Sequence, residues 1–294
     1  MKKVQKSALQ CIVFLLVLAV MFFALDTLLR AFNPIGHLPF FQKNDHEVTI
    51  AIHGTSDFDK VFFGSSPVVS AFRENYSISG FVEMGIVLGT VECILAMLER
   101  RYITISEELV LGLSIALLMD DLHTDPRYIW NRRRFEPYVY FYRDRLNTFF
   151  VSAITNFLNG NFYLQRHPSL EKWLYFGTIS DEALEAMIES HMERFWFADI
   201  STFSDNLAAL ERLVAFCEHN NIRLRAVWMP VNPDVPSPEL YERVFAKVNG
   251  ILGGIEVLDL FDAFPRSHFY DIGHMNDIPG AVDFTREIDK WLVR

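Results

Sequence analysis

The sequence predicts an α/β domain in which helices cover both faces of a parallel five-stranded sheet. Two observations predict it: from residue 48 onward short apolar runs alternate with longer amphipathic stretches, and the amphipathic stretches have the spacing of helices with one apolar face. The expected strands are 60–63, 79–84, 109–113, 224–229 and 255–260. One helix is expected to begin at Pro67, and four more are expected at 90–100, 204–219, 238–249 and 279–292.

The local signals of these elements follow in chain order. Lys60-Val-Phe-Phe63 is typical of a buried strand, and Gly64-Ser65-Ser66 is a turn before a helix that opens at Pro67. The helix at 204–219 is apolar at Leu207, Leu210, Leu213, Val214 and Cys217. Five strands in this alternation predict a flavodoxin-like, doubly wound sheet, whose sites lie at the carboxyl ends of the strands.

The N-terminus predicts a membrane anchor. After a basic head with Lys2, Lys3 and Lys6, residues 7–25 carry no charge, and a helix of that length spans roughly 28 Å. The lysines are expected to stay cytoplasmic, which places the rest of the chain outside. A cleaved signal peptide is the alternative, although no small-x-small cleavage site follows. The expected parts are a cytoplasmic tail (1–6), a transmembrane anchor (7–30), a linker (31–47) and the α/β domain (48–294).

The alternation of strands and helices breaks between 120 and 200. This stretch is rich in aromatic residues and contains the basic run Arg132-Arg133-Arg134. We interpret it as a helical insertion that forms a cap beside the site. Three roles are open for its aromatic residues: they pack a helical subdomain, they contact a substrate, or they form a docking face for a membrane partner.

Composition excludes some classes of function. A formal net charge of −10 argues against nucleic-acid binding, which needs a basic surface. The three cysteines suggest no disulfide scaffold, and no Cys or His spacing typical of a metal site occurs. Asp120-Asp-Leu-His-Thr-Asp125 holds enough ligand types for a metal but is better explained as a polar loop. We expect no cofactor and no metal.

Three residues predict a serine catalytic triad. Ser66 is expected to cap the helix that follows the first strand, with its hydroxyl exposed at the carboxyl end of the sheet. Asp271 and His274, three residues apart before the last helix, would supply the acid that orients the base and the base itself. His268 is a weaker candidate for the base. An ordinary serine cap is the alternative for Ser66 alone.

These motifs resemble those of the SGNH/GDSL hydrolase superfamily, in particular its branch with the D-alanyl-lipoteichoic acid biosynthesis protein DltD. The resemblance covers roughly Val61 to Leu292 outside the insertion. It implies Ser66 in the first motif and Asp271 and His274 in the last, and it implies an oxyanion hole that includes the backbone N–H of Ser66. Further matches are Gly85 as a second oxyanion donor, Asn276 and Gly280 after the histidine, and Met229-Pro-Val-Asn-Pro233.

One motif departs from that superfamily. The usual Asn after the third strand, which completes the oxyanion hole, is missing from Leu111-Gly-Leu-Ser-Ile115. Ser114 is the candidate substitute. Losing one such donor typically costs about 10²–10³ in turnover.

The residues and the resemblance together predict an extracytoplasmic serine esterase or acyltransferase. Its substrate would be an ester-linked acyl group, acetyl or D-alanyl, on a cell-envelope polysaccharide, a teichoic acid or an acyl carrier. The alternative is a non-catalytic SGNH-like accessory subunit of a membrane acyltransferase or polymer-export system. A lipase-like esterase that uses the aromatic cap as an acyl pocket is a third option.

Overall fold

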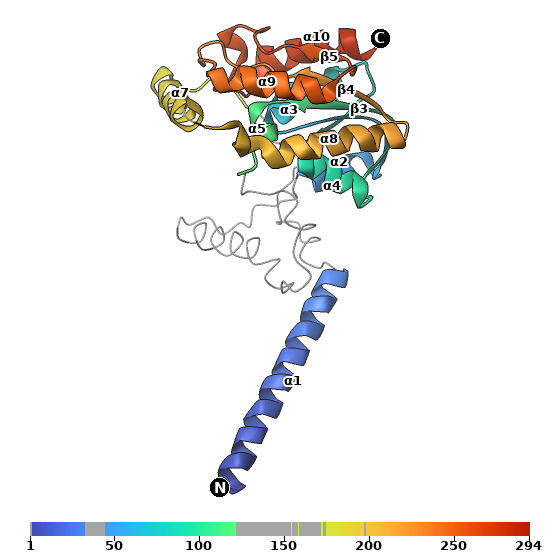
Figure 1. Ribbon diagram of the computed structural model, residues 1–294, viewed down its shortest axis with the longest axis vertical. Coiled ribbons are helices and arrows are strands. Elements are labelled where there is room, and N and C mark those ends of the chain that lie inside the picture. The colour runs from blue at the N-terminus through green and yellow to red at the C-terminus, as the bar shows by residue number, and fades with distance from the viewer. Residues whose placement is uncertain are drawn as a thin grey trace. The chain divides into compact units, whose positions relative to one another are not determined.

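The computed structural model describes residues 2–32, 45–121, 154, 158, 172, 175–196 and 198–294. They divide into two compact units, one formed by 1–43 and 127–169 and the other by 44–126 and 170–294. The second unit contains the sheet and every described residue of the candidate site (Figure 1).

The second unit is built on a five-stranded sheet in which each neighbouring pair of strands is parallel. The strand order β2-β1-β3-β4-β5 is the flavodoxin-like order, so the predicted fold class is confirmed at this level. The strands are β1 (Asp57–Gly64), β2 (Val82–Gly85), β3 (Thr104–Leu113), β4 (Arg223–Trp228) and β5 (Val257–Asp259).

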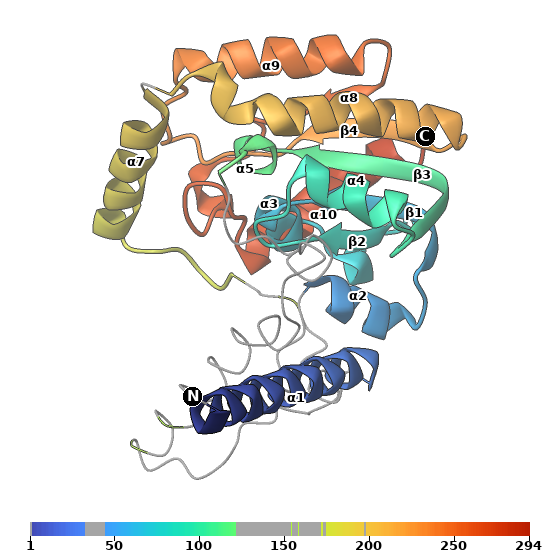
Figure 2. The same ribbon diagram turned by 60° about the horizontal axis from the view of Figure 1, so that its bottom comes forward.

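Helices pack on both faces of this sheet (Figure 2). One face carries α4 (Val91–Glu99), α8 (Ser204–His219) and α9 (Glu239–Leu252), and the other carries α3 (Ser66–Ala71) and α10 (Val282–Leu292). Successive strand residues alternate between the faces, so Phe62, Val110 and Val227 join the core beneath α3 and α10. The other α-helices that the structure describes in this unit are α2 (Asp45–His53), α5 (Ile115–Leu118) and α7 (Asp181–Trp196). Short helical turns lie at Glu74–Tyr76, Ile200–Phe203, Arg266–His268 and Asp277–Ala281.

Two strand-end glycines allow α3 to lie close to the sheet. A Cβ atom added at Gly64 would come within 2.2 Å of Val68 Cγ2, and one added at Gly112 would come within 2.3 Å of the same atom. Val68 is fully buried between these glycines. Because Ser66 precedes Val68 by two residues, this close packing fixes the turn that carries the predicted nucleophile.

Several element boundaries differ from the sequence prediction, and the largest difference is that β3 begins at Thr104 instead of residue 109. The second strand begins at Val82 instead of residue 79, because Asp289 accepts hydrogen bonds from Ser77 Oγ (2.7 Å) and the Ile78 N–H (2.8 Å) and holds the preceding chain as a loop. Helix α3 starts at Ser66, with Ser65 as its N-cap, one residue earlier than expected. Helix α2 begins at Asp45, inside the range predicted to be linker.

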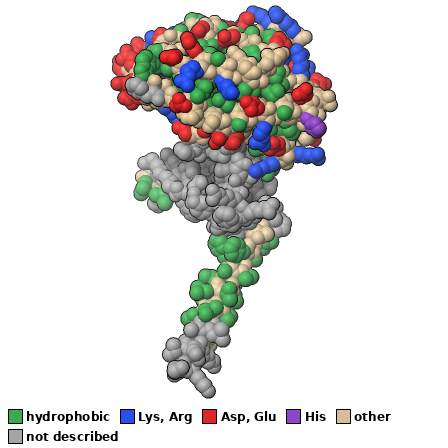
Figure 3. Space-filling view, viewed as in Figure 1, with side chains coloured by type: hydrophobic (Ala, Val, Ile, Leu, Met, Phe, Trp, Pro, Cys, Tyr) green, Lys and Arg blue, Asp and Glu red, His purple; other side chains and the backbone are tan. Residues whose placement is uncertain are grey.

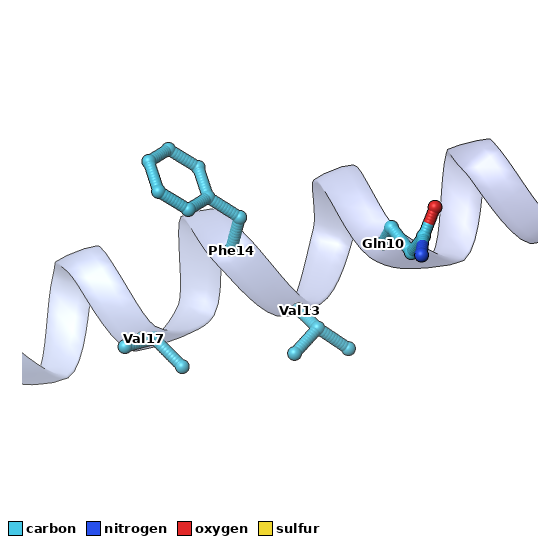
Figure 4. Close-up of a pocket in the computed structure, with 4 residues that line it drawn as sticks. All are labelled: Gln10, Val13, Phe14 and Val17. Atoms are coloured by element: carbon cyan, nitrogen blue, oxygen red, sulfur yellow. The ribbon is translucent and has the colours of Figure 1, made fainter.

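The described part of the first unit is helix α1 (Lys2–Phe32) with Ile154 and Leu158. Figure 4 shows Gln10, Val13, Phe14 and Val17 along this helix. Among the residues that the structure describes, no helix combines the length and the hydropathy needed to cross a bilayer. The anchor at 7–30 stays a prediction.

The described residues of the predicted insertion include helix α7. Its exposed face is acidic, and acidic side chains gather on that side of the molecule (Figure 3). The basic run at 132–134 and most of the aromatic residues of the insertion lie outside the described residues. The aromatic residues inside them are Tyr175, Phe176, Phe195 and Trp196.

Candidate active site

Ser66, His274 and Asp271 form a continuous hydrogen-bonded series. His274 Nε2 lies 2.8 Å from Ser66 Oγ. On the other side of the ring, His274 Nδ1 lies 2.7 Å from Asp271 Oδ2. Asp271 is 4% exposed, whereas Ser66 and His274 are partly open to solvent. An accessible hydroxyl, an imidazole in contact with it and a buried carboxylate are the arrangement that activates a serine nucleophile.

The turn that carries Asp271 and His274 is fixed by its own backbone. Asp271 Oδ1 accepts hydrogen bonds from the N–H groups of Gly273 (3.0 Å) and His274 (2.9 Å). The Tyr270 N–H donates to the His274 carbonyl at 2.8 Å. From the segment after β4, the buried Asn232 side chain donates to the Asp271 carbonyl at 3.0 Å. The imidazole therefore projects from a rigid turn.

The electrostatic environment keeps Asp271 ionised. Burial acts to raise the pKa of this carboxyl, but the hydrogen bond and charge of His274 and the N–H groups of Gly273 and His274 outweigh it. The pKa of Asp271 therefore lies below its ordinary value of 3.8. The carboxylate can hold the proton of His274 on Nδ1, which leaves Nε2 as the acceptor for the Ser66 proton.

The lowered pKa of Asp271 predicts a contribution to acid stability. Because the folded-state pKa is below the unfolded one, the carboxylate stabilises the fold above the unfolded pKa, and this contribution is lost as the pH falls through the folded value. We expect Asp271→Asn to unfold at lower urea concentration than wild type at pH 7. The difference in unfolding free energy should shrink below about pH 4. A pH-independent difference would contradict this.

Ser66 is held from both sides of its turn. Ser65 is buried and extended (φ −85°, ψ −162°), and its hydroxyl lies 3.0 Å from Ser114 Oγ at the end of β3. One turn into α3, Ser70 Oγ accepts a hydrogen bond from the Met275 N–H at 3.1 Å. Since Met275 follows His274, this bond ties the helix of the nucleophile directly to the turn of the base.

The predicted oxyanion donor Gly85 has another partner in this structure. Its N–H donates to Glu83 Oε1 at 2.5 Å. The other carboxylate oxygen of Glu83 pairs with Lys172 Nζ at 2.7 Å, and Lys172 also donates to the carbonyls of Glu83 (2.9 Å) and Gly85 (3.2 Å). Burial raises the pKa of Glu83, and the charge of Lys172 opposes that shift. Gly85 would reach an oxyanion only after Glu83 moves.

The other two predicted oxyanion donors differ in how they are placed. The Ser66 N–H belongs to the first turn of α3, where a helix leaves its amide groups without an intrahelical partner. Ser114 caps α5, accepts a hydrogen bond from the Leu117 N–H (3.1 Å) and contacts Ser65. Its hydroxyl proton can still point outward if Ser65 is the donor of their shared hydrogen bond.

Two contacts of the site were missed by the sequence analysis. The Tyr175 ring stacks on the His274 ring with centroids 4.4 Å apart and an interplanar angle of 9°. Lys172 reaches the end of β2 from the same short segment. Tyr175 was visible only as one of many aromatic residues of the insertion. The lone lysine at 172 carried no pattern at all.

The weaker predictions are explained by other contacts. His268 Nε2 lies 3.1 Å from Asp283 Oδ2. Asp120 accepts hydrogen bonds from the N–H groups of Asp205 and Asn206 at the start of α8, and Asp121 pairs with Arg194 at 2.7 Å. Among the residues that the structure describes, no cluster of three His, Cys, Asp or Glu side chains could hold a metal ion. His123 and Asp125 lie outside them.

The residues implied after the histidine support its turn. Asn276 Oδ1 accepts the Gly280 N–H (2.9 Å), and Asn276 Nδ2 donates to the Ser267 carbonyl (2.8 Å). A Cβ atom at position 280 would come within 2.1 Å of the His268 carbonyl oxygen, so only glycine fits.

Comparison with protein-family models and with curated proteins finds no match for this chain. The site therefore has to be interpreted from its own geometry.

Proposed function

We propose that the protein is a serine esterase or acyltransferase of the SGNH type. Its substrate is an ester-linked acyl group, acetyl or D-alanyl, on a polysaccharide or teichoic acid of the cell envelope. The observation that carries this proposal is the Ser66–His274–Asp271 series, with 2.8 Å between hydroxyl and base and 2.7 Å between base and carboxylate. These distances fall in the range required for proton transfer during nucleophilic attack.

The first half of the reaction follows from this geometry. His274 Nε2 takes the Ser66 proton while Ser66 Oγ attacks the acyl carbonyl carbon, and the carbonyl oxygen becomes an oxyanion. As the tetrahedral intermediate collapses, the bond to the leaving alkoxide breaks and the proton passes from His274 to that oxygen. An alcohol leaves, and the acyl group remains on Ser66.

The second half of the reaction decides between hydrolysis and transfer. Water or a sugar or polyol hydroxyl gives a proton to His274 Nε2 and attacks the Ser66 ester. The bond between the acyl carbon and Ser66 Oγ breaks, and the proton returns to Ser66. Both outcomes use the same residues, so the acceptor that reaches the site determines the product.

The cell-envelope substrate and the location outside the cytoplasm rest on the sequence. The uncharged run at 7–25 after three lysines supports a single-pass anchor with this domain on the extracytoplasmic side. An anchored enzyme would act on polymers or acyl carriers beside the membrane. The resemblance of the Ser66 and Asp271–His274 motifs supports the choice of ester chemistry.

Covalent labelling with a fluorophosphonate tests the proposed activity. We expect wild type to gain one phosphonyl adduct, mapped to Ser66, and Ser66→Ala to gain none. Ser65→Ala is the matched control, because Ser65 is the adjacent serine but is 1% exposed and bonded to Ser114. Adduct formation on Ser66→Ala, or its absence from wild type, would refute the proposal.

One observation favours the alternative of a non-catalytic accessory subunit. The Gly85 N–H is held by the Glu83 carboxylate, and Leu111-Gly-Leu-Ser-Ile115 lacks the usual Asn, so the oxyanion hole has fewer donors ready. Such a subunit would bind a polymer or a membrane acyltransferase. Wild type and Ser66→Ala would then co-purify with that partner equally well, and the fluorophosphonate would label neither protein.

A further inference from the structure

The segment that leads into α7 contributes a ring to the site. Tyr175 stacks face to face on His274, with centroids 4.4 Å apart and the planes within 9° of parallel. Burial and then the charge of Asp271 raise the pKa of Tyr175 to about 12, so the phenol is neutral near pH 7. The contact is therefore one between a neutral aromatic face and an imidazole.

Tyr175 is held in place independently of His274. Its carbonyl accepts a hydrogen bond from the Asp277 N–H at 2.7 Å, just beyond the turn of the base. Its ring also packs against Tyr270, with centroids 5.2 Å apart. Close by, the Ile179 N–H donates to the Tyr270 carbonyl at 3.0 Å. Because these contacts do not involve the imidazole, they hold the Tyr175 ring over His274 even when the imidazole loses a hydrogen bond.

The stacking matters most when Ser66 is acylated. In the resting site, the imidazole contacts Ser66 Oγ, Asp271 and the Tyr175 ring. Once Ser66 carries the acyl group, Oγ has no proton to donate and its hydrogen bond to His274 is lost. Among the described residues, the contacts to Asp271 and Tyr175 are then the ones that orient the imidazole.

We propose that Tyr175 is a positioning residue that holds the His274 ring in plane during deacylation. The inference rests on the proposed function. In that step, Nε2 must take a proton from the attacking water or hydroxyl while the bond between the acyl carbon and Ser66 Oγ breaks, and Ser66 recovers the proton. A ring that tilts away from the ester misplaces the attacking oxygen. Tyr175 prevents that tilt by covering one face of the imidazole.

The test separates the two half-reactions with p-nitrophenyl acetate. Acylation is followed by release of p-nitrophenol, and deacylation by loss of the acetyl mass from protein freed of excess ester. We expect Tyr175→Leu to slow deacylation about three- to tenfold, the effect of losing one aromatic contact, and to change acylation by less than about twofold. Tyr175→Phe keeps the ring and should restore both rates.

Phe176→Leu is the matched control, because it removes an adjacent aromatic ring that is 69% exposed. It should leave both rates unchanged. Equal slowing of both steps in Tyr175→Leu, or no slowing, would overturn the positioning role while leaving the proposed function intact. If Tyr175→Leu does not fold, Tyr175→Met provides the same comparison. A wild-type protein that never acquires the acetyl group would overturn the proposed function, and this inference with it.

Discussion

Asp271→Asn is expected to slow acylation of Ser66 by about 10⁴-fold, because it forces the wrong tautomer on His274. Asp271 Oδ1 accepts two backbone N–H groups, from Gly273 and His274, while Oδ2 faces His274 Nδ1. In the Asp271→Asn variant the amide oxygen must satisfy the two backbone donors, so the amide NH₂ faces Nδ1. His274 then carries its proton on Nε2, which can no longer accept the proton of Ser66.

The structure supplies a matched control for this substitution. His268 and Asp283 form a second His–Asp pair nearby, with 3.1 Å between Nε2 and Oδ2. Asp283→Asn should leave the acylation rate within about twofold of wild type, since we assign no role in the reaction to that pair. Stopped-flow measurement of p-nitrophenol release gives both rates. A larger loss in Asp283→Asn than in Asp271→Asn would mean that His268 is the base.

The largest expected effect on stability is that of Arg225→Met, about 3–5 kcal/mol in unfolding free energy. Arg225 is 1% exposed and is ion-paired with the buried Glu108 through Nε. Its other nitrogens donate to the carbonyls of Trp291 (2.9 Å) and Leu292 (3.2 Å) at the end of α10. The guanidinium also lies 4.3 Å from the centre of the Trp291 ring. Removing it takes the guanidinium donors away from both carbonyls, of which that of Trp291 keeps the Arg294 N–H (3.3 Å). It also leaves the buried Glu108 carboxylate with the longer ion pair to Arg223 Nε (3.7 Å).

Two variants identify the cause of that loss in equilibrium urea unfolding. Arg225→Met combined with Glu108→Met also removes the buried carboxylate and should recover part of the stability, while the hydrogen bonds of the guanidinium to the end of α10 stay lost. Arg212→Met breaks the exposed Arg212–Glu99 pair and should cost less than about 1 kcal/mol. If Arg212→Met and Arg225→Met lose similar amounts of unfolding free energy, burial of the Arg225–Glu108 pair does not explain the effect.

The strands and most helices could be predicted from the sequence because their signals are local. Helix 204–219 has the bounds that the apolar spacing predicts. The start of β2 could not be predicted, because Asp289, more than 200 residues away, holds the chain at Ser77 and Ile78. Likewise, Arg225 appears in sequence as a charge inside an apolar run, and its partner Glu108 and the end of α10 become visible only in the folded protein.

The candidate triad could be proposed from sequence because each of its parts carries a motif. Ser66 follows a strand and a glycine, and Asp271 and His274 share one turn. The oxyanion hole was harder to predict from the sequence, because it depends on the direction in which individual N–H groups point. Gly85 is the last residue of β2, yet its N–H donates to Glu83, and that carboxylate is held by Lys172 from a distant segment. Tyr175 reaches His274 in the same way, through tertiary packing alone.

In the proposed mechanism, His274 activates Ser66 for covalent attack on an ester. Its most direct test is intact mass spectrometry with peptide mapping after brief exposure of wild type, Ser66→Ala and His274→Ala to p-nitrophenyl acetate. We predict a single acetyl group on Ser66 of wild type and none on either variant over the same time. Acetylation of His274→Ala at the wild-type rate would contradict the account.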